Sequence, residues 1–183
     1  MDELIDIVDE FGNYTGKTCL KSEAHKHGYF HSTIHVWLYT KDHQILLQKR
    51  ALTKKVFPGL WDISVAGHIA AGEDIKIAAL REIKEEIGFT LHPKGLHKIG
   101  TRKHMITHPN GIIDNEFHHV FIAELTLPIN ELRLQKEEVD ELSLFPLETL
   151  KNTKNLENIL LPRFHDYYCF VYDEIRNQLL LTS

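Results

Sequence analysis

Residues 67–89 constrain the fold more than any other part of the chain, because a glycine-punctuated loop leads there into a segment with helical periodicity. On a helix that advances about 100° per residue, three glutamates fall within an arc of roughly 100° and three apolar residues point the other way. The acidic face consists of Glu82, Glu85 and Glu86, and the apolar face of Ala79, Ile83 and Ile87. The pattern predicts a helix with one face on the core, ended by Gly88 as a left-handed cap.

Three carboxylates spaced i, i+3 and i+4 on one helix repel one another unless a cation lies among them. Carboxylate oxygens are hard ligands, which suit Mg²⁺ or Mn²⁺ better than Zn²⁺. The segment therefore predicts a divalent-metal site that has a diphosphate as its natural ligand. The alternative interpretation is a solvated acidic helix face that binds no metal.

The spacing of residues in this segment resembles the complete Nudix box, the signature of the Nudix hydrolase family. The matching positions are Gly67, Glu73, Arg81, Glu82, Ile83, Glu85, Glu86, Gly88 and Phe89. The resemblance implies a Nudix-type α/β/α sandwich with a mixed sheet, in which the box runs loop, helix, loop. It also implies that the three glutamates and the Gly67 carbonyl hold Mg²⁺ or Mn²⁺. Arg81 and Glu73 would orient the carboxylates, with ordinary surface ion pairs as the alternative.

A second region resembles the Nudix branch that includes isopentenyl-diphosphate isomerase. It comprises residues 47–50, which read Leu-Gln-Lys-Arg, and residues 57–68, which begin Phe-Pro-Gly-Leu-Trp and end Gly-His. The similarity extends over about residues 4–150. That isomerase carries a catalytic cysteine immediately before the Gly-His or Ser-His pair, whereas this chain has Ala66 there. Since a methyl group cannot transfer a proton, an intact box together with Ala66 predicts an isomerase-like hydrolase.

Five residues match in type a separate metal site of the isomerase. They are His25, His31, His68, Asp114 and Glu116. The interval from His25 to His31 is one residue shorter than in the isomerase, and His27 competes for the first position. The resemblance implies a second metal site here, and a polar pocket lining without metal is the alternative. Nitrogen ligands mixed with carboxylates favour Zn²⁺ or Mn²⁺ over Mg²⁺.

Lys49 and Arg50 end a predicted strand just before the loop that leads to the box. Their positive charges make them candidate ligands for the phosphates of a substrate. A solvated strand edge is the alternative interpretation of the same two residues.

The length and composition predict one domain over residues 1–183, which the resemblance implies is a Nudix hydrolase domain, with a C-terminal helix at about 162–180 as an extension. Its 43% apolar residues are enough for a buried core, and a net charge of −5 argues against a nucleic-acid polymer as partner. The first residues lack the pattern of a signal peptide and no apolar run reaches membrane-spanning length, so we expect a cytoplasmic protein without a membrane partner. Cys19 and Cys169 are expected to be reduced thiols. The oligomeric state stays open, with a homodimer among the alternatives.

Hydrophobic alternation and turn residues predict strands on both sides of the box helix. The predicted strands are residues 4–8, 15–20, 34–39, 45–48, 61–65, 89–91, 97–101, 117–125 and 142–145. The first two and the next two are expected to form hairpins. Helices are predicted at residues 147–150 and 163–180, the latter beginning after Pro162.

These features favour a Mg²⁺-dependent hydrolase of a small-molecule diphosphate, with a nucleoside diphosphate derivative as the best substrate class. An isopentenyl-diphosphate isomerase is a second hypothesis, which Ala66 disfavours. A third is a sensor that binds a nucleotide without cleaving it. Such a sensor would be expected to have lost box carboxylates, and this chain retains all of them. The identity of the substrate does not follow from the box, because other loops recognise the rest of the molecule.

Overall fold

The structure, a computed structural model, describes residues 2–152, 160 and 164–182. Its strands are β1 (Leu4–Val8), β2 (Tyr14–Leu20), β3 (His31–Tyr39), β4 (Gln44–Arg50), β5 (Trp61–Asp62), β6 (Val65–His68), β7 (His97–Thr107), β8 (Ile113–Glu124) and β9 (Val139–Pro146). Its helices are α1 (Lys21–His27), α2 (Ile75–Ile87) and α4 (His165–Thr182), with short 3₁₀ turns at Pro93–Gly95, Ile129–Glu131 and Leu147–Leu150.

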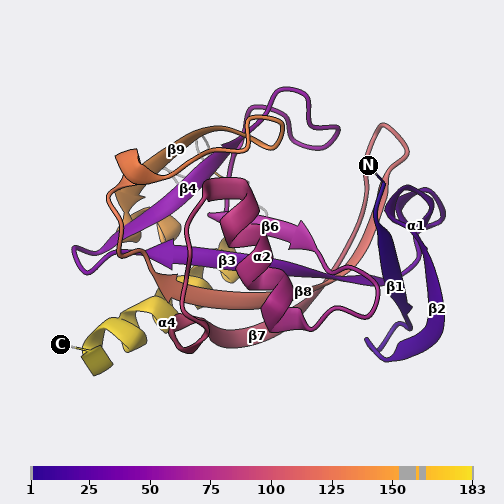
Figure 1. Ribbon diagram of the computed structural model, residues 1–183, viewed down its shortest axis with the longest axis horizontal. Helices are drawn as coiled ribbons and strands as arrows, with labels where there is room; N and C mark the ends of the chain where they lie inside the picture. The colour runs from indigo at the N-terminus through magenta and orange to yellow at the C-terminus, as the bar shows by residue number, and fades with distance from the viewer. Residues whose placement is uncertain (1, 153–159, 161–163, 183) are drawn as a thin grey trace.

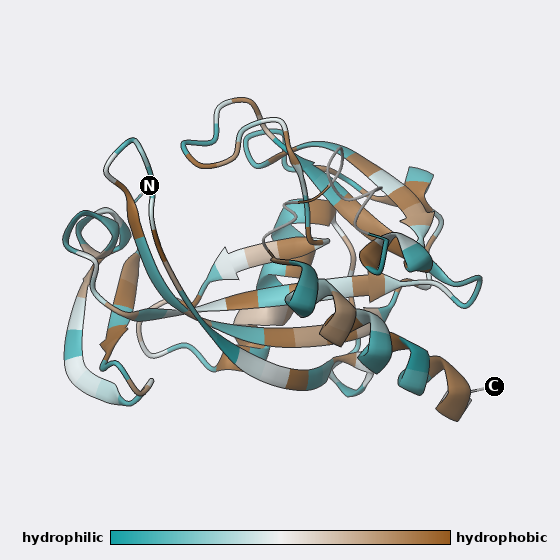
Figure 2. Cartoon of the chain, turned by 180° about the vertical axis from the view of Figure 1, so that it is seen from behind, coloured by the Kyte–Doolittle hydropathy of each residue, from teal (hydrophilic) through white to brown (hydrophobic). Residues whose placement is uncertain are grey.

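The strands form one mixed sheet around β3, with α2 on one face and α4 on the other (Figure 1). Strand β3 runs parallel to β8 over nine residue pairs and antiparallel to β6 over four. Strand β4 pairs with β9, and β7 pairs with β8. Seen from behind, apolar and polar positions alternate along the strands, as expected for a sheet whose two faces have different neighbours (Figure 2). The predicted α/β sandwich with a mixed sheet is confirmed.

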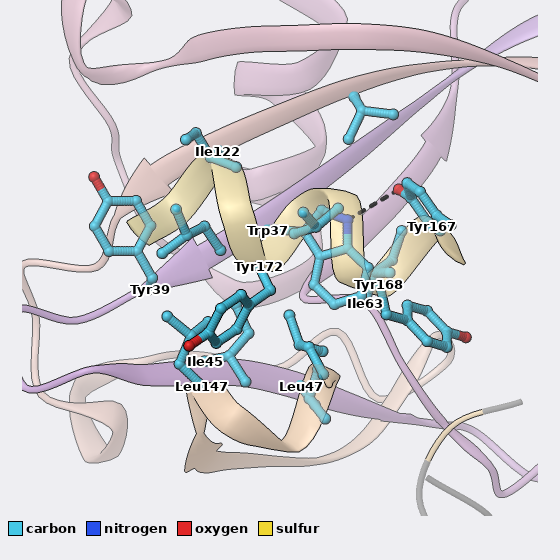
Figure 3. Close-up of a cluster of buried hydrophobic side chains, with 14 of the residues drawn as sticks. Trp37, Tyr39, Ile45, Leu47, Ile63, Ile122, Leu147, Tyr167, Tyr168 and Tyr172 are labelled. Carbon is cyan, nitrogen blue, oxygen red and sulfur yellow. Dashed lines mark hydrogen bonds between the residues drawn. The ribbon is translucent and has the colours of Figure 1, made fainter. Parts of the chain in front are cut away.

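Each face of the sheet has its own hydrophobic core, because neighbouring residues of β3 point to opposite sides. Ile34, Val36 and Leu38 pack with the apolar face of α2. Trp37 packs on the opposite face with the aromatic residues of α4, where its indole nitrogen donates a hydrogen bond to the Tyr167 hydroxyl at 2.9 Å (Figure 3). The C-terminal helix is thus integrated into the core on this face.

The predicted N-terminal hairpin is confirmed, since β1 and β2 pair antiparallel from Leu4 with Leu20 onward. Helix α1, which the sequence interpretation missed, follows directly and lies beside the hairpin (Figure 1). It has only two turns and no side-chain N-cap, and it ends at Gly28 with φ 67°. Such a short helix leaves little apolar periodicity to detect.

The predicted strand at residues 61–65 is wrong as a single element, because the structure has two strands separated by Ile63 and Ser64. The buried Ser64 hydroxyl accepts a hydrogen bond from the Leu38 amide at 2.8 Å and donates one to the Leu46 carbonyl at 2.5 Å. This side chain therefore takes up two backbone groups of β3 and β4, and the chain turns into β6 beside them.

The strand predicted at residues 89–91 is also wrong. This segment is irregular. The apolar side chain of Phe89 is buried in the core with the apolar face of α2 and does not belong to a strand. The predicted hairpin of residues 34–48 exists, but its strands pair only at Tyr39 and Ile45 before β4 turns away to β9. The 3₁₀ turn at Leu147–Leu150 and the C-terminal helix are confirmed, whereas the predicted start after Pro162 lies outside the described residues.

Cys19 and Cys169 are both free thiols, as predicted. Among the described residues, no helix has the length and apolar content needed to cross a membrane.

Replacing Ile83 by Ala should lower the free energy of unfolding by about 2–5 kcal/mol, because this fully buried side chain of α2 would leave a cavity between helix and sheet. Ile77→Ala is the matched control on the same helix, since Ile77 is 59% exposed, and its effect should stay within about 0.5 kcal/mol. Urea unfolding followed by circular dichroism measures both changes. Equal losses in the two variants would contradict the assigned orientation of α2.

Candidate functional site

Helix α2 places the box glutamates against the sheet. Asp74 caps its first turn by accepting hydrogen bonds from the amides of Lys76 and Ile77, and Gly88 ends it with φ 69° as predicted. Glu82 and Glu86 are 8% and 4% exposed, whereas the side chain of Glu85 is 52% exposed. The alternative interpretation of a solvated acidic helix face is therefore wrong for Glu82 and Glu86, whose charged side chains are buried.

Arg81 organises the entrance to this carboxylate group. Its guanidinium donates two hydrogen bonds of 2.9 Å to the Glu73 carboxylate, forming a bidentate pair. It also donates to Glu82 at 2.8 Å, to Glu85 at 3.0 Å and to the carbonyl of His68 at 3.1 Å. Arg81 thus orients two box carboxylates and ties them to β6. The bidentate partner is Glu73, which in turn accepts a hydrogen bond from the Ala70 amide at 3.1 Å.

Gly67 lies in contact with the Glu82 side chain. A β-carbon built at this position would lie 2.1 Å from Cδ of Glu82, so any other residue would displace the carboxylate. The close approach brings the backbone of β6 beside the carboxylates of α2. This proximity is needed if the Gly67 carbonyl and the glutamates are to bind the same metal ion.

Burial raises the pKa of both inner carboxyls. Desolvation is the largest cause for Glu82, where Arg81 acts in the opposite direction. Desolvation also raises the pKa of Glu86 well above its ordinary value, with the charge of Glu82 as the next cause. The Gln48 amide donates to Glu86 at 3.3 Å, but this neutral group supplies no charge. Two buried carboxylates whose ionisation is disfavoured fit a divalent cation as the missing positive charge.

A second group of candidate ligands gathers on the other side of β6. Ligand atoms of His25, His31, His68 and Glu116 all lie within 4.8 Å of one another. The Nδ1–H of His31 donates to the Tyr29 carbonyl at 2.9 Å, so its Nε2 carries the lone pair, and that buried atom has no hydrogen-bond partner. An orphaned buried imidazole nitrogen beside a carboxylate fits a transition-metal ion.

A neighbouring imidazole favours the ionised form of Glu116 within this group. Although burial opposes it, hydrogen bonding from His118 holds the pKa of Glu116 well below its ordinary value. The Nε2–H of His118 donates to Glu116 at 2.8 Å. Desolvation lowers the pKa of His68 well below its usual range, so its imidazole is neutral and able to act as a ligand.

The structure brings together four of the five residues predicted for this second site. Asp114 lies outside the group and instead accepts hydrogen bonds from His25 Nδ1 at 2.9 Å and from His108 Nε2 at 2.7 Å. His27, the alternative first ligand, pairs with Glu23 on the exposed side of α1 at 3.1 Å. The competition between His25 and His27 is thus resolved for His25.

The three box glutamates of the first group and His25, His68 and Glu116 of the second line one cavity of about 850 Å³ that extends past β6. Strand β6 separates them, because Gly67 contacts Glu82 on α2 while His68 contacts His25. The cavity also has a basic side and an aromatic wall. The basic side consists of Arg50, Lys54 and Lys55, and the wall of Trp61, Phe164, Tyr167 and Tyr168.

The two predicted phosphate ligands of β4 have different surroundings. Arg50 lines the cavity and is held by Asp62 at 3.1 Å and by the Val56 carbonyl at 3.0 Å. Lys49 is not among the lining residues and faces Glu141 of β9 at 3.8 Å. Neighbouring residues of a strand point to opposite faces, so the two could not both reach the cavity.

Residues 29–165 match the model of the NUDIX domain. The chain belongs to the Nudix family. Over its whole length it is 35% identical to Nudix hydrolase 3 of Arabidopsis thaliana, although it corresponds to only 24% of that protein's length. It is also 36% identical to isopentenyl-diphosphate Delta-isomerase 2 of Photorhabdus laumondii, over 67% of each chain.

The fold is also found among solved structures. The crystal structure of DR0079 from Deinococcus radiodurans superposes with a TM-score of 0.69 at 16% identity, covering 91% of this chain and 97% of that one. The MutT protein from Methanosarcina mazei gives a TM-score of 0.61 at 20% identity, over 80% of this chain and 95% of that one. At these identities the likeness concerns the fold alone.

Several residues of the site were not found from the sequence. Those that line the cavity are Lys54, Lys55, Arg102, His118, Phe164, Tyr167 and Tyr168. Two more bond to candidate site residues, Gln48 to Glu86 and His108 to Asp114. A signal existed for Gln48, because strand alternation places it on the same face as Arg50 and opposite to Lys49. The aromatic residues of α4 gave no such signal. Their helical spacing indicates that they are buried, but it does not indicate which cavity they line.

The buried carboxyl of Glu86 predicts a pH-dependent stability in the absence of metal. A carboxyl whose pKa is raised on folding binds its proton more tightly in the folded state, so the free energy of unfolding falls as pH rises through the folded-state pKa. In chelator-containing buffer, Glu86→Gln should therefore be more stable than the wild type at pH 8, and the difference should shrink at pH 5.

Thermal unfolding at the two pH values checks this expectation, with Glu137→Gln, an exposed carboxyl, as the control. A wild type that is more stable than Glu86→Gln at pH 8 in chelator would contradict a desolvated carboxylate at this position.

Proposed function

We propose that this chain is a Mg²⁺-dependent or Mn²⁺-dependent hydrolase of the diphosphate linkage in a nucleoside diphosphate derivative or related organic diphosphate. The observation that carries the proposal is the burial of Glu82 and Glu86 beside Gly67, where Arg81 pairs with Glu82 and the neutral Gln48 amide donates to Glu86. Family membership supports the coarser statement that the chain acts on diphosphates. Retention of all three box glutamates argues for catalysis over a nucleotide sensor.

Glu82, Glu85, Glu86 and the Gly67 carbonyl are the residues that would hold the metal. When bound there, a divalent cation supplies charge neutralisation for the diphosphate and lowers the pKa of a coordinated water. Hard oxygen donors in this number suit Mg²⁺, and Mn²⁺ can replace it.

The protein's own side chains fix this geometry. Arg81 holds the carboxylates of Glu82 and Glu85 in place, and Glu73 fixes Arg81 through its bidentate contact. This preorganisation spares the carboxylates from reorienting when a substrate arrives. Arg81 and Glu73 are therefore positioning residues in this proposal.

Arg50, Lys54 and Lys55 are the proposed ligands of the substrate's phosphates. Arg50 is fixed by Asp62, and Lys54 pairs with Glu138, which also lines the cavity. A phosphate that enters beside Lys54 would compete with Glu138 for its ammonium group. Fixed cations next to the box would align the diphosphate for attack and balance its charge.

The group of His25, His31, His68 and Glu116 is proposed to hold a second, transition-metal ion such as Zn²⁺ or Mn²⁺. Three imidazoles and one carboxylate form a donor set unlike the oxygen donors of the box. No step of the proposed hydrolysis depends on this ion.

Isomerase chemistry is not favoured by the residues of the cavity. Ala66 lies on β6 opposite His35 and presents a methyl group where the isomerase carries its cysteine. Neither Cys19 nor Cys169 is among the residues that line the cavity. The proposed reaction is therefore hydrolysis, although isomerases are among the relatives.

The Glu85→Gln, Glu86→Gln double variant should lower hydrolysis by at least about 10²-fold, because the metal-assisted step loses two of its ligands. The purified chain with Mg²⁺ is first tested against a panel of diphosphates, with detection of released phosphate and monophosphates. Glu131→Gln with Glu141→Gln removes the same charge from exposed positions outside the cavity and serves as the control. Unchanged turnover in the box double variant would overturn the assignment.

The wild type should not convert isopentenyl diphosphate into dimethylallyl diphosphate, because Ala66 cannot transfer a proton. Product analysis by chromatography after prolonged incubation with Mg²⁺ and Mn²⁺ tests this point. Conversion by protein free of contaminating isomerase would show that another residue replaces the cysteine.

A further inference from the structure

The histidines of the second candidate site are oriented by partners on their far sides. The Nδ1 of His31 donates to the Tyr29 carbonyl, and the Nδ1 of His25 faces two acceptors, Asp114 at 2.9 Å and the Ile113 carbonyl at 3.4 Å. Both acceptors require a proton on Nδ1. The Nε2 atoms of His25 and His31 are therefore the nitrogens left to bind an ion.

Asp114 does not lie among the ligand atoms, although its residue type would allow it. Its Oδ1 contacts His25 on the ring nitrogen that faces away from the group, and its Oδ2 accepts from His108 Nε2 at 2.7 Å. Its two oxygens are thus occupied by two imidazoles. Glu116 supplies the carboxylate oxygen of the group, at 3.4 Å from His31 Nε2 and 3.9 Å from His68 Nε2.

His108 is fixed in the connection between β7 and β8. It is 7% exposed, its amide donates to the Ile112 carbonyl at 2.8 Å, and its ring packs edge-on against Phe57 at 5.3 Å between centroids. A buried and well-anchored imidazole can hold a carboxylate in one orientation. His108 therefore fixes Asp114, and Asp114 fixes His25.

We propose that Asp114 and His108 form a positioning pair that sets the tautomer and orientation of His25, and that the metal ligands are His25, His31, His68 and Glu116 alone. The proposal rests on the proposed metal at the histidine group and assigns no role in the hydrolysis itself. A carboxylate behind a metal-binding imidazole raises the basicity of the ligand and restricts its ring. The chain would thus use Asp114 for positioning and not for coordination.

Co²⁺ is a suitable probe, because its visible absorption reports the number and type of ligands in a site that accepts Zn²⁺. Wild-type protein titrated with Co²⁺ at pH 8 should bind one ion at the histidine group. Asp114→Ala should keep this stoichiometry and spectrum while weakening affinity by about 10–100-fold. Asp114→Asn, whose amide oxygen still accepts from His25, should lose less. Glu116→Gln should instead alter the spectrum or abolish binding, because it removes a ligand.

His108→Phe provides the second arm, since it keeps an aromatic ring but removes the donor to Asp114. It should weaken Co²⁺ binding in the same sense as Asp114→Ala, and the double variant should be no weaker than Asp114→Ala alone. His97→Phe, on the exposed start of β7, is the matched control and should leave affinity unchanged. Loss of the ion or a changed spectrum in Asp114→Ala would make Asp114 a ligand and overturn the proposal, as would unchanged affinity in both Asp114→Ala and His108→Phe.

A metal-free readout separates this proposal from the presence of the metal. Imidazole ¹⁵N correlation spectra should show His25 protonated at Nδ1 in the wild type and a different tautomer population in Asp114→Ala. If the wild type binds no Co²⁺ but the tautomer shift occurs, the metal site fails and the positioning pair stands. An unshifted His25 in Asp114→Ala would exclude the positioning pair whatever the metal result.

Discussion

The burial of two carboxylates between α2 and β6 is the constraint on which the site depends. Glu82 and Glu86 are held there because the apolar face of the same helix is anchored in the core, so the helix cannot rotate to expose them. Gly67 makes the arrangement possible, since a side chain on β6 would occupy the space of Glu82. Desolvated like charges destabilise the metal-free fold locally, and a divalent cation removes that cost.

Strand β6 connects this constraint to the rest of the cavity. Its residues alternate between two environments, with Gly67 against α2 and His68 in the histidine group. Arg81 reinforces the connection by bonding to the box carboxylates and to the His68 carbonyl. Two sites of different ligand chemistry therefore share one short strand, and a change in the backbone there would affect both.

The sequence predicted the parts of this arrangement that depend on local periodicity. The box helix, its Gly88 end, the N-terminal hairpin and the histidine group apart from Asp114 all followed from spacing or resemblance. Burial of Glu82 and Glu86 did not, because charged residues on one helix face normally indicate solvent. The contacts of Asp114 and Lys49 were predicted wrongly for a different reason. The partner that an acidic or lysine side chain contacts depends on strand register, and long-range pairing sets that register.

Proton release on metal binding tests the central claim most directly. If Glu82 and Glu86 are desolvated and partly protonated without metal, Mg²⁺ must displace protons as it binds. Calorimetric titration with Mg²⁺ in buffers of different ionisation enthalpy should show proton release at pH 6 that declines towards pH 9, with a smaller release in Glu86→Gln. Saturable Mg²⁺ binding without proton release at pH 6, or equal binding by the Glu82→Gln, Glu86→Gln double variant, would contradict the account.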